Sequence, residues 1–251
     1  FMARNFYGVL KVYEGDIGRE DWRRYLWHGR ISHGSQFLQP DRRRTPTLYY
    51  GTGTGVAMAI QHHPRREQGL RVGVIGLGAG TLAAYGGPKD SLRFYEINPE
   101  VVGLAREFFY YLEDTPAEVD IVLGDARMSL QEELRRGGSQ DFDVLAMDAF
   151  SSDAIPVHLL TREAFELYQS HLRDDGILAV HISNLFFDFK PLMRALSTAM
   201  KWPAIVVENP EVEESEVFST EWALMTRNER FLSNASVRQS VSPWPLEDTD
   251  D

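Results

Sequence analysis

Three alternating glycines stand out in the chain: Gly76, Gly78 and Gly80, which follow the short β-branched run that begins at Val72. Glycine adopts positive φ angles without a steric penalty, so this spacing allows a tight turn and a close approach of the backbone to a bound molecule. A helix predicted to begin at Thr81 would direct its N-terminal N–H groups toward that molecule. The alternative is a tight turn in an ordinary α/β sheet.

Two carboxylates follow later strands. Glu96 ends a strand predicted at 92–96, where it could accept both hydroxyls of a ribose. Asp125 follows a strand predicted at 119–123, where it could accept a hydrogen bond from an exocyclic amine such as adenine N6. Asp125 could equally cap the helix that begins near Arg127, and one side chain could do either. The glycine turn, the strand and the terminal acid together predict nucleoside binding.

Asp148 ends a predicted strand and is followed by a loop that contains Asp153 and Pro156. An acid at the end of a central strand, partly desolvated beside a ligand, can act as a general base or hold a cation. Capping of the loop is the alternative, and the position at the strand end favours the functional role. The histidines lack a metal-ligand spacing, so we expect them to have polar roles in the core or on the surface and we expect no metal.

From Arg71 onward, strands alternate with helices, a pattern that predicts an α/β fold with a parallel, doubly wound sheet. Two later runs, at 204–207 and 221–225, are expected to form an antiparallel hairpin that closes the sheet edge. The predicted strands are 72–76, 92–96, 119–123, 143–147 and 177–182, and the predicted helices are 80–86, 99–111, 127–136, 161–173 and 189–200. In such a sheet the ligand lies beyond the carboxyl ends of the strands, where all the candidate acids are placed.

The N-terminal part has a different pattern. Residues 5–38 alternate apolar and polar side chains between turn residues, which predicts a small antiparallel β-sheet, and a helix is predicted at 49–61. We therefore expect an N-terminal β-hairpin domain at 1–45, a nucleoside-binding catalytic domain at 46–232, and a disordered acidic tail at 233–251.

Composition limits the possible partners. With 26 basic and 37 acidic residues the net charge is −11, which disfavours nucleic acid and suits a small cationic substrate. The chain has no cysteine and no apolar run of the ~18 residues that cross a bilayer, so we expect a cytoplasmic location without membrane contact by these residues. The unusual start, Phe1-Met2, leads us to expect either a residue left by cloning or a missing upstream segment that could tether the chain to a membrane.

Several motifs, taken in order, resemble the spermidine synthase family of polyamine aminopropyltransferases. The likeness covers residues 5–226 and is strongest to bacterial spermidine-synthase-like domains that are often fused to membrane transporter segments. The motifs are His33-Gly-Ser-Gln36, Pro46-Thr-Leu-Tyr-Tyr50, Gly76-Leu-Gly-Ala-Gly80, Tyr95-Glu-Ile-Asn98, Gly124-Asp125 and 148–156. The resemblance implies a homodimer, with a small N-terminal antiparallel β domain packed on a Rossmann-like, seven-stranded sheet of methyltransferase type.

The resemblance also implies roles for single residues. Glu96 would hold the ribose of decarboxylated S-adenosylmethionine, the co-substrate, while Asp125 would bind the adenine amine and Gln36 the nucleoside side. Asp148 would take a proton from the attacking amine and Asp153 would assist it. Tyr49 and Tyr50 would line the channel for the amine acceptor, and no metal would take part.

The chain departs from the family pattern at three places. Ala79 stands where the glycine motif of the family carries an acid, and Thr45-Pro46 and Gly51 stand where acids flank the channel tyrosine. These departures leave two alternatives open. One is an S-adenosylmethionine-dependent methyltransferase, and the other is a catalytically weak nucleoside- or polyamine-binding domain of a larger membrane protein.

Overall fold

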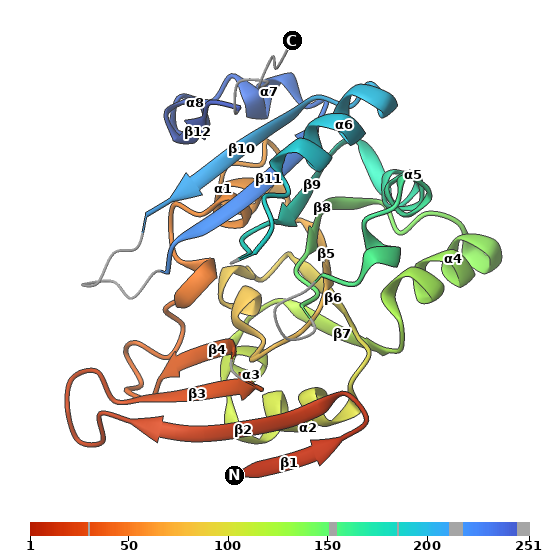
Figure 1. Ribbon diagram of the computed structural model, residues 1–251. Coiled ribbons are helices and arrows are strands. Elements are labelled where there is room, and N and C mark those ends of the chain that lie inside the picture. Colours follow the sequence, from red (N-terminus) through yellow and green to blue (C-terminus); the bar gives the residue numbers. More distant parts are fainter. Residues whose placement is uncertain (30, 151–154, 185, 211–217, 245–251) are drawn as a thin grey trace.

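A computed structural model describes residues 1–29, 31–150, 155–184, 186–210 and 218–244, which form two sheets (Figure 1). The smaller sheet is antiparallel and follows chain order, as the alternating N-terminal pattern predicts. Its strands are β1 (Met2–Asn5), β2 (Gly8–Gly15), β3 (Arg23–His28) and β4 (Ile31–Phe37).

The larger sheet has the order β12-β10-β11-β9-β8-β5-β6-β7. Its strands are β5 (Arg71–Ile75), β6 (Ser91–Glu96), β7 (Glu118–Leu123), β8 (Phe142–Met147), β9 (Leu172–His181), β10 (Ala204–Asn209), β11 (Thr220–Thr226) and β12 (Val241–Ser242). Strands β5 to β9 are parallel, whereas β10, β11 and β12 pair antiparallel. The expected seven strands are therefore confirmed as β5 to β11, with β12 as a two-residue addition at the edge.

Helices cover both faces of this sheet. They are α1 (Gly55–Gln61), α2 (Pro99–Phe108), α3 (Tyr111–Asp114), α4 (Ala126–Gly137), α5 (Arg162–Ser170), α6 (Lys190–Met200), α7 (Glu229–Leu232) and α8 (Ala235–Ser240), with 3₁₀ helices η1 (Leu48–Tyr50), η2 (Arg66–Gln68), η3 (Thr81–Tyr85) and η4 (Val157–Leu159). None of the helices in the described ranges has both the length and the apolar character needed to cross a membrane.

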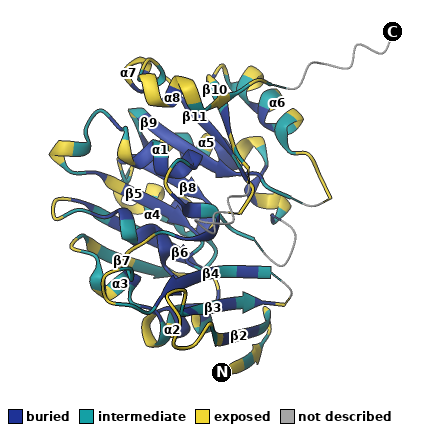
Figure 2. Cartoon of the chain, turned by 90° about the vertical axis from the view of Figure 1, so that its left-hand side faces the viewer, coloured by how far each residue is buried: buried dark blue, intermediate teal, exposed yellow. Residues whose placement is uncertain are grey.

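Successive side chains of β8 point to opposite faces of the sheet, and they pack into two separate hydrophobic cores. Val144 and Ala146 pack in the core shared with α1, α2 and η3, whereas Leu145 and Met147 pack in the core shared with α4, α5 and α6. All four side chains are inaccessible to solvent, and the central strands are the most buried part of the molecule (Figure 2). A strand buried on both faces is typical of a parallel sheet with helices on each side.

Several helices are shorter than predicted or are divided in two, because the chain makes a different interaction at those places. The helix expected at 161–173 ends at Ser170, because Leu172 already pairs with Phe142 at the start of β9. The helix expected at 80–86 is the 3₁₀ helix η3, and the helix expected at 49–61 divides into η1 and α1.

Part of the expected acidic tail is ordered. Asn234 caps α8 by accepting hydrogen bonds from the N–H groups of Ser236 and Val237, and the Val237 side chain is fully buried. Val241 then pairs with Val207 on β10. Apolar anchors and a helix cap thus order the first half of the segment, and residues 245–251 lie outside the described residues.

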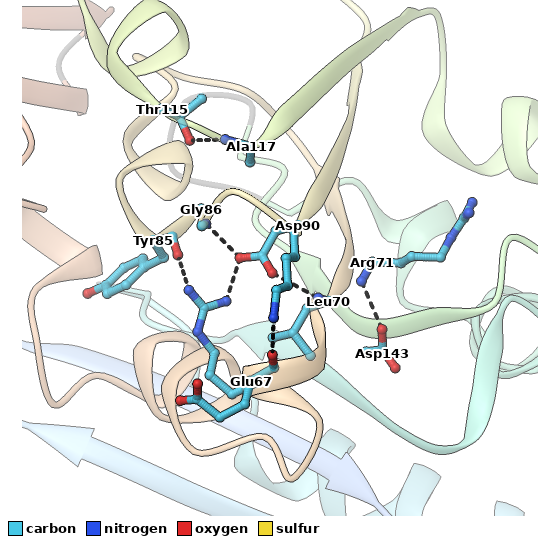
Figure 3. A network of polar contacts seen from close by, with 12 residues as sticks. Glu67, Leu70, Arg71, Tyr85, Gly86, Asp90, Thr115, Ala117 and Asp143 are labelled. Carbon is cyan, nitrogen blue, oxygen red and sulfur yellow. Dashed lines mark hydrogen bonds and ion pairs between the residues drawn. The ribbon is translucent and has the colours of Figure 1, made fainter.

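A buried polar network fixes the amino ends of β5 and β6 (Figure 3). The Asp90 carboxylate accepts hydrogen bonds from the Leu70 N–H at 2.8 Å and from Arg66 Nη1 at 2.5 Å. Arg66 Nη2 also donates to the carbonyl of Tyr85, the last residue of η3, at 2.8 Å. The network therefore links η3, which follows the glycine turn, to the two strands that carry the turn and Glu96.

Candidate active site

The order of winding in the large sheet reverses between β5 and β8. The chain runs from β5 outward through β6 to β7 and then returns to place β8 on the other side of β5. The glycine turn follows β5 and Asp148 follows β8, so both lie at the crevice where open α/β sheets bind ligands. The two loops touch, because a Cβ atom on Gly76, which has a φ of +99°, would lie 2.4 Å from the Asp148 carbonyl oxygen.

The small sheet packs directly on the glycine turn. The Ala79 N–H donates to the His33 carbonyl oxygen at 3.1 Å. Gly78 has a φ of +54°, and a Cβ atom there would lie 2.4 Å from the same oxygen. Strand β4 therefore forms a second wall opposite the sheet edge, and this close approach is the reason for glycine at position 78.

The first of two cavities lies between the glycine turn, Glu96 and the small sheet, and we call it the Glu96 cavity. The sequence-predicted residues that line it are Gly76, Gly78, Glu96, Asp125 and Asp148, together with Tyr50. It is further lined by the histidines 28, 33 and 158 and by apolar side chains, among them Leu77, Ile97, Phe150 and Leu159.

Glu96 is held in place by backbone donors. One carboxylate oxygen accepts from the Leu77 N–H at 3.0 Å, and the other accepts from the Asn98 N–H at 2.8 Å. Desolvation raises the pKa of this buried carboxyl, and the backbone hydrogen bonds oppose the rise. A carboxylate has about four acceptor positions, so Glu96 can still accept from a hydroxyl of a ligand.

Asp125 makes one contact that caps a helix and one contact with a histidine. Its Oδ1 accepts from the Met128 N–H at 2.9 Å at the start of α4, and its Oδ2 lies 2.9 Å from Nε2 of His158. The carboxylate still lines the Glu96 cavity. The structure therefore shows the capping role, and a ligand amine would have to share Oδ2 with His158.

The second cavity lies between η1, β9 and β11, and we call it the Tyr49 cavity. Its walls include the aromatic side chains of Trp27, Tyr49, Phe150 and Phe218 as well as polar ones such as Ser183 and Asn184. Asp148 and Glu221 are the carboxylates among the described residues that line it. An apolar site with a few polar groups of this kind suits a small organic molecule that carries one polar end.

Asp148 lies where the two cavities meet. His33, Tyr50, Asp148 and Phe150 line both. The Tyr50 hydroxyl donates to Asp148 Oδ2, and His181 Nδ1 lies 2.7 Å from Asp148 Oδ1. The Asp148 side chain is 11% exposed, so it is both oriented and open to a ligand.

His181 is a candidate site residue that sequence reasoning missed. Its ring stacks on Trp222, with centroids 4.6 Å apart and planes 9° apart, and its Nε2 lies 2.9 Å from Ser183 Oγ. His181 ends β9, which neighbours β8, so the strand-end argument applied to Asp148 would also have selected it. In the sequence His181 is one of several histidines without a recognisable spacing, so the pattern does not single it out.

Burial keeps the other polar rings at the junction neutral. Desolvation lowers the pKa of His33 to about 4, with a smaller contribution from His28. Desolvation and the charge of Asp148 raise the pKa of Tyr49 to about 12 and raise the pKa of Tyr50 well above its ordinary value. At neutral pH, Asp148 is therefore surrounded by an uncharged imidazole and by phenols that can donate hydrogen bonds.

Two of the predicted site residues lie elsewhere, and a third falls outside the described residues. Gln36 is fully buried and does not line either cavity; its amide bonds the Arg43 carbonyl and the Tyr110 N–H, each at 2.8 Å. Gly80 begins η3 against Leu112 and also lies outside the lining. Asp153 falls outside the described residues, among which no group of three or more acidic or histidine side chains is arranged to hold a metal ion.

Known proteins with similar sequences include aminopropyltransferases and a methyltransferase. No protein family model matches the chain. The polyamine aminopropyltransferase of Vibrio vulnificus is 31% identical over 151 residues, which cover 58% of this chain and 46% of that protein. The N-terminal histidine N-methyltransferase of Emericella nidulans is 31% identical over 122 residues, which cover 47% of this chain and 21% of that protein. The chain thus spans less than half the length of both.

Among solved structures, spermidine synthase from Thermotoga maritima superposes over 100% of this chain and 78% of its own, with a TM-score of 0.65 and 16% sequence identity. The chain is thus similar in fold to this spermidine synthase and similar in part of its sequence to a polyamine aminopropyltransferase. The structural likeness at this identity concerns the fold, and it covers both the small N-terminal sheet and the large one. In this chain Glu96 ends β6, and Asp125 and Asp148 follow the ends of β7 and β8, as the sequence indicates.

Proposed function

We propose that the protein transfers an aminopropyl group from decarboxylated S-adenosylmethionine to an amine acceptor. The observation that carries the proposal is the position of Asp148, which lines both cavities. A transfer between two substrates needs the reacting carbon and the attacking nitrogen to meet at one point, and two cavities that join at a carboxylate suit that need.

The Glu96 cavity is the proposed donor site. Glu96 would accept from the ribose hydroxyls, and the purine would lie toward Asp125. Among the described lining residues, three are carboxylates and none is lysine or arginine. Such a site suits a donor that carries only positive charges, whereas S-adenosylmethionine also carries a carboxylate that would lack a cationic partner.

The proposed reaction is a substitution at the propyl carbon of the donor. The amine nitrogen attacks the propyl carbon bound to the sulfonium, the new C–N bond forms, and the C–S bond breaks with its electron pair passing to sulfur. The products are methylthioadenosine and a secondary amine, whose extra proton passes to Asp148. A sulfonium is already a good leaving group, so placement and proton removal are the main tasks of the protein.

Asp148 is prepared for this role by its neighbours. Tyr50 and His181 each occupy one carboxylate oxygen, so the carboxylate plane is fixed while lone pairs remain for the amine. Tyr49 would contact the acceptor in the second cavity. We also propose that Asp153 assists from the following loop, and that the protein acts as a cytoplasmic homodimer on a small cationic amine, in keeping with its net charge of −11.

Mass analysis of the products tests the proposal. The purified protein is incubated with an amine panel and either decarboxylated S-adenosylmethionine or S-adenosylmethionine. We expect amines that gain one aminopropyl group with the decarboxylated donor only, together with an equal amount of methylthioadenosine. A gain of one methyl group with S-adenosylmethionine would replace the proposal with a methyltransferase, and no gain with either donor would leave a binding domain.

A further inference from the structure

We propose that Lys190 restricts the acceptor to a monoamine with an apolar or aromatic tail, because its ammonium already occupies the carboxylate that a second acceptor ammonium would need. The inference rests on the proposed aminopropyl transfer and goes further by assigning the class of acceptor and the residue that selects it.

Lys190 bridges two glutamates beside the Tyr49 cavity. Its Nζ lies 2.6 Å from Glu208 Oε1 and 3.0 Å from Glu221 Oε1. The two glutamates are partners in the β10–β11 register, and Lys190 begins α6. Burial lowers the pKa of Lys190, but the hydrogen bonds to both carboxylates outweigh it, so the net pKa lies above the ordinary value and the side chain is a cation.

This arrangement engages one oxygen of the second described carboxylate of the cavity and places a cation beside it. Asp148 faces the reacting nitrogen, which leaves Glu221 as the described lining carboxylate that could hold a distal ammonium. Glu221 Oε1 is already bound to Lys190, and an incoming ammonium would also meet the positive charge of Lys190 at short range. Among the lining residues that the structure describes, the second charge of a diamine would therefore lose hydration without gaining a carboxylate that is free of another cation.

Apart from Ser32, Ser183, Asn184 and Ser219, the remaining described walls suit an uncharged tail. Trp27, Ile31, Tyr49 and Phe218 offer apolar and aromatic surface to the part of the acceptor beyond its amine. Aromatic faces attract cations as well, but more weakly than a free carboxylate does. An alkyl or aromatic tail buries apolar surface there without the desolvation of a second charge.

Butylamine and 1,4-diaminobutane are the matched probes, because they share a chain length and differ in the distal ammonium. For the wild-type protein we expect kcat/KM for butylamine to equal or exceed that for the diamine. Lys190→Met should raise the ratio of diamine to monoamine by at least about tenfold, because it frees Glu221. Lys190→Arg, which keeps the charge, should retain the wild-type ratio.

Two further variants isolate the cause. Lys190→Met/Glu221→Gln should lose the gain, because the freed carboxylate is gone. Lys89→Met removes the same charge from an exposed residue that bonds the Glu67 carbonyl, and it should leave the ratio unchanged. Circular dichroism checks the folding of each variant, and Lys190→Gln replaces Lys190→Met if the latter does not fold.

The inference is overturned if the wild-type protein prefers the diamine by more than about tenfold, if the ratio is unchanged without Lys190, or if the gain persists in the double variant. Each of these results leaves aminopropyl transfer intact. Absence of transfer to any amine is a different result, which would overturn the proposed function and this inference with it.

Discussion

His181 Nδ1 lies 2.7 Å from Oδ1 of Asp148, and the His181 ring is fixed in turn by its stacking on Trp222. The pair joins the ends of two neighbouring strands, β8 and β9. A carboxylate held from one side by an imidazole and from the other by the Tyr50 hydroxyl has little rotational freedom. This preorganisation is what a base at the junction of two substrate sites requires.

His181→Phe should lower turnover by about 10- to 100-fold, because Asp148 loses a hydrogen-bond partner and its fixed orientation while the stacking on Trp222 is kept. His181→Gln restores a donor and should recover part of the loss. Steady-state kinetics with saturating donor provides the measurement. Equal rates for the wild type and His181→Phe would show that the contact does not position the base.

Asp148→Asn should lower turnover by about 10²- to 10⁴-fold and leave donor affinity nearly unchanged, because the proton acceptor acts in the transition state and the amide keeps the size of the side chain. Single-turnover rates and the dissociation constant of methylthioadenosine separate the two effects. A parallel loss of rate and affinity would assign Asp148 to donor binding.

Glu96→Ala should weaken the binding of methylthioadenosine by roughly ten- to a hundredfold, the effect of losing about 1.5–3 kcal/mol of hydrogen bonding to a ribose. The matched control is Glu107→Gln, a change of charge at an exposed position near the end of α2. Calorimetry measures both variants. The ribose assignment fails if Glu96→Ala binds as tightly as the control.

The stability of the fold should depend on pH through His33. Its folded-state pKa of about 4 lies below the unfolded value of 6.5, so the unfolded chain binds more protons between these limits. The contribution is fully present above pH 6.5 and is lost as the pH falls toward 4. His33→Gln should flatten the rise of the unfolding free energy in that window by up to about 1.4 kcal/mol per pH unit. Urea denaturation at several pH values measures the slope, and identical slopes would contradict the burial effect.

Asp90→Ala should lower the unfolding free energy by about 2–4 kcal/mol, because the Leu70 N–H loses its partner and Arg66 keeps only the Tyr85 carbonyl. Glu67→Gln alters an exposed acid in the same region and should change stability by less than about 0.5 kcal/mol. Urea denaturation compares the two. Equal small effects would show that the network in Figure 3 does not stabilise the strands that carry the glycine turn and Glu96.

The sequence predicted the fold well where local patterns and strand order coincide. The β-branched run before Gly76 and the acids at 96 and 148 indicated the strands and the edge at which their side chains gather. Residues defined by contacts between distant segments were harder to predict. Gln36 belongs to a motif that resembles spermidine synthases, yet it bonds Arg43 and Tyr110 inside the core, and only the packing of β4 on neighbouring loops reveals this.

His181 and Lys190 show the same limit at the site itself. Strand order places His181 beside Asp148, but no spacing in the sequence brings the two together. The bridge from Lys190 to Glu208 and Glu221 depends on the register of the β10–β11 hairpin and on where α6 begins. Ionic contacts between elements set by tertiary packing have no periodic signature in the sequence.

The most direct test of the account is a crystal structure of the protein with methylthioadenosine and butylamine bound together. We expect the nucleoside in the Glu96 cavity, with its ribose hydroxyls on Glu96, and the amine in the Tyr49 cavity. The amine nitrogen should lie within hydrogen-bond distance of Asp148 and face the thioether sulfur. A nucleoside bound elsewhere, or an amine that does not contact Asp148, would contradict the claim that the two substrates meet at this carboxylate.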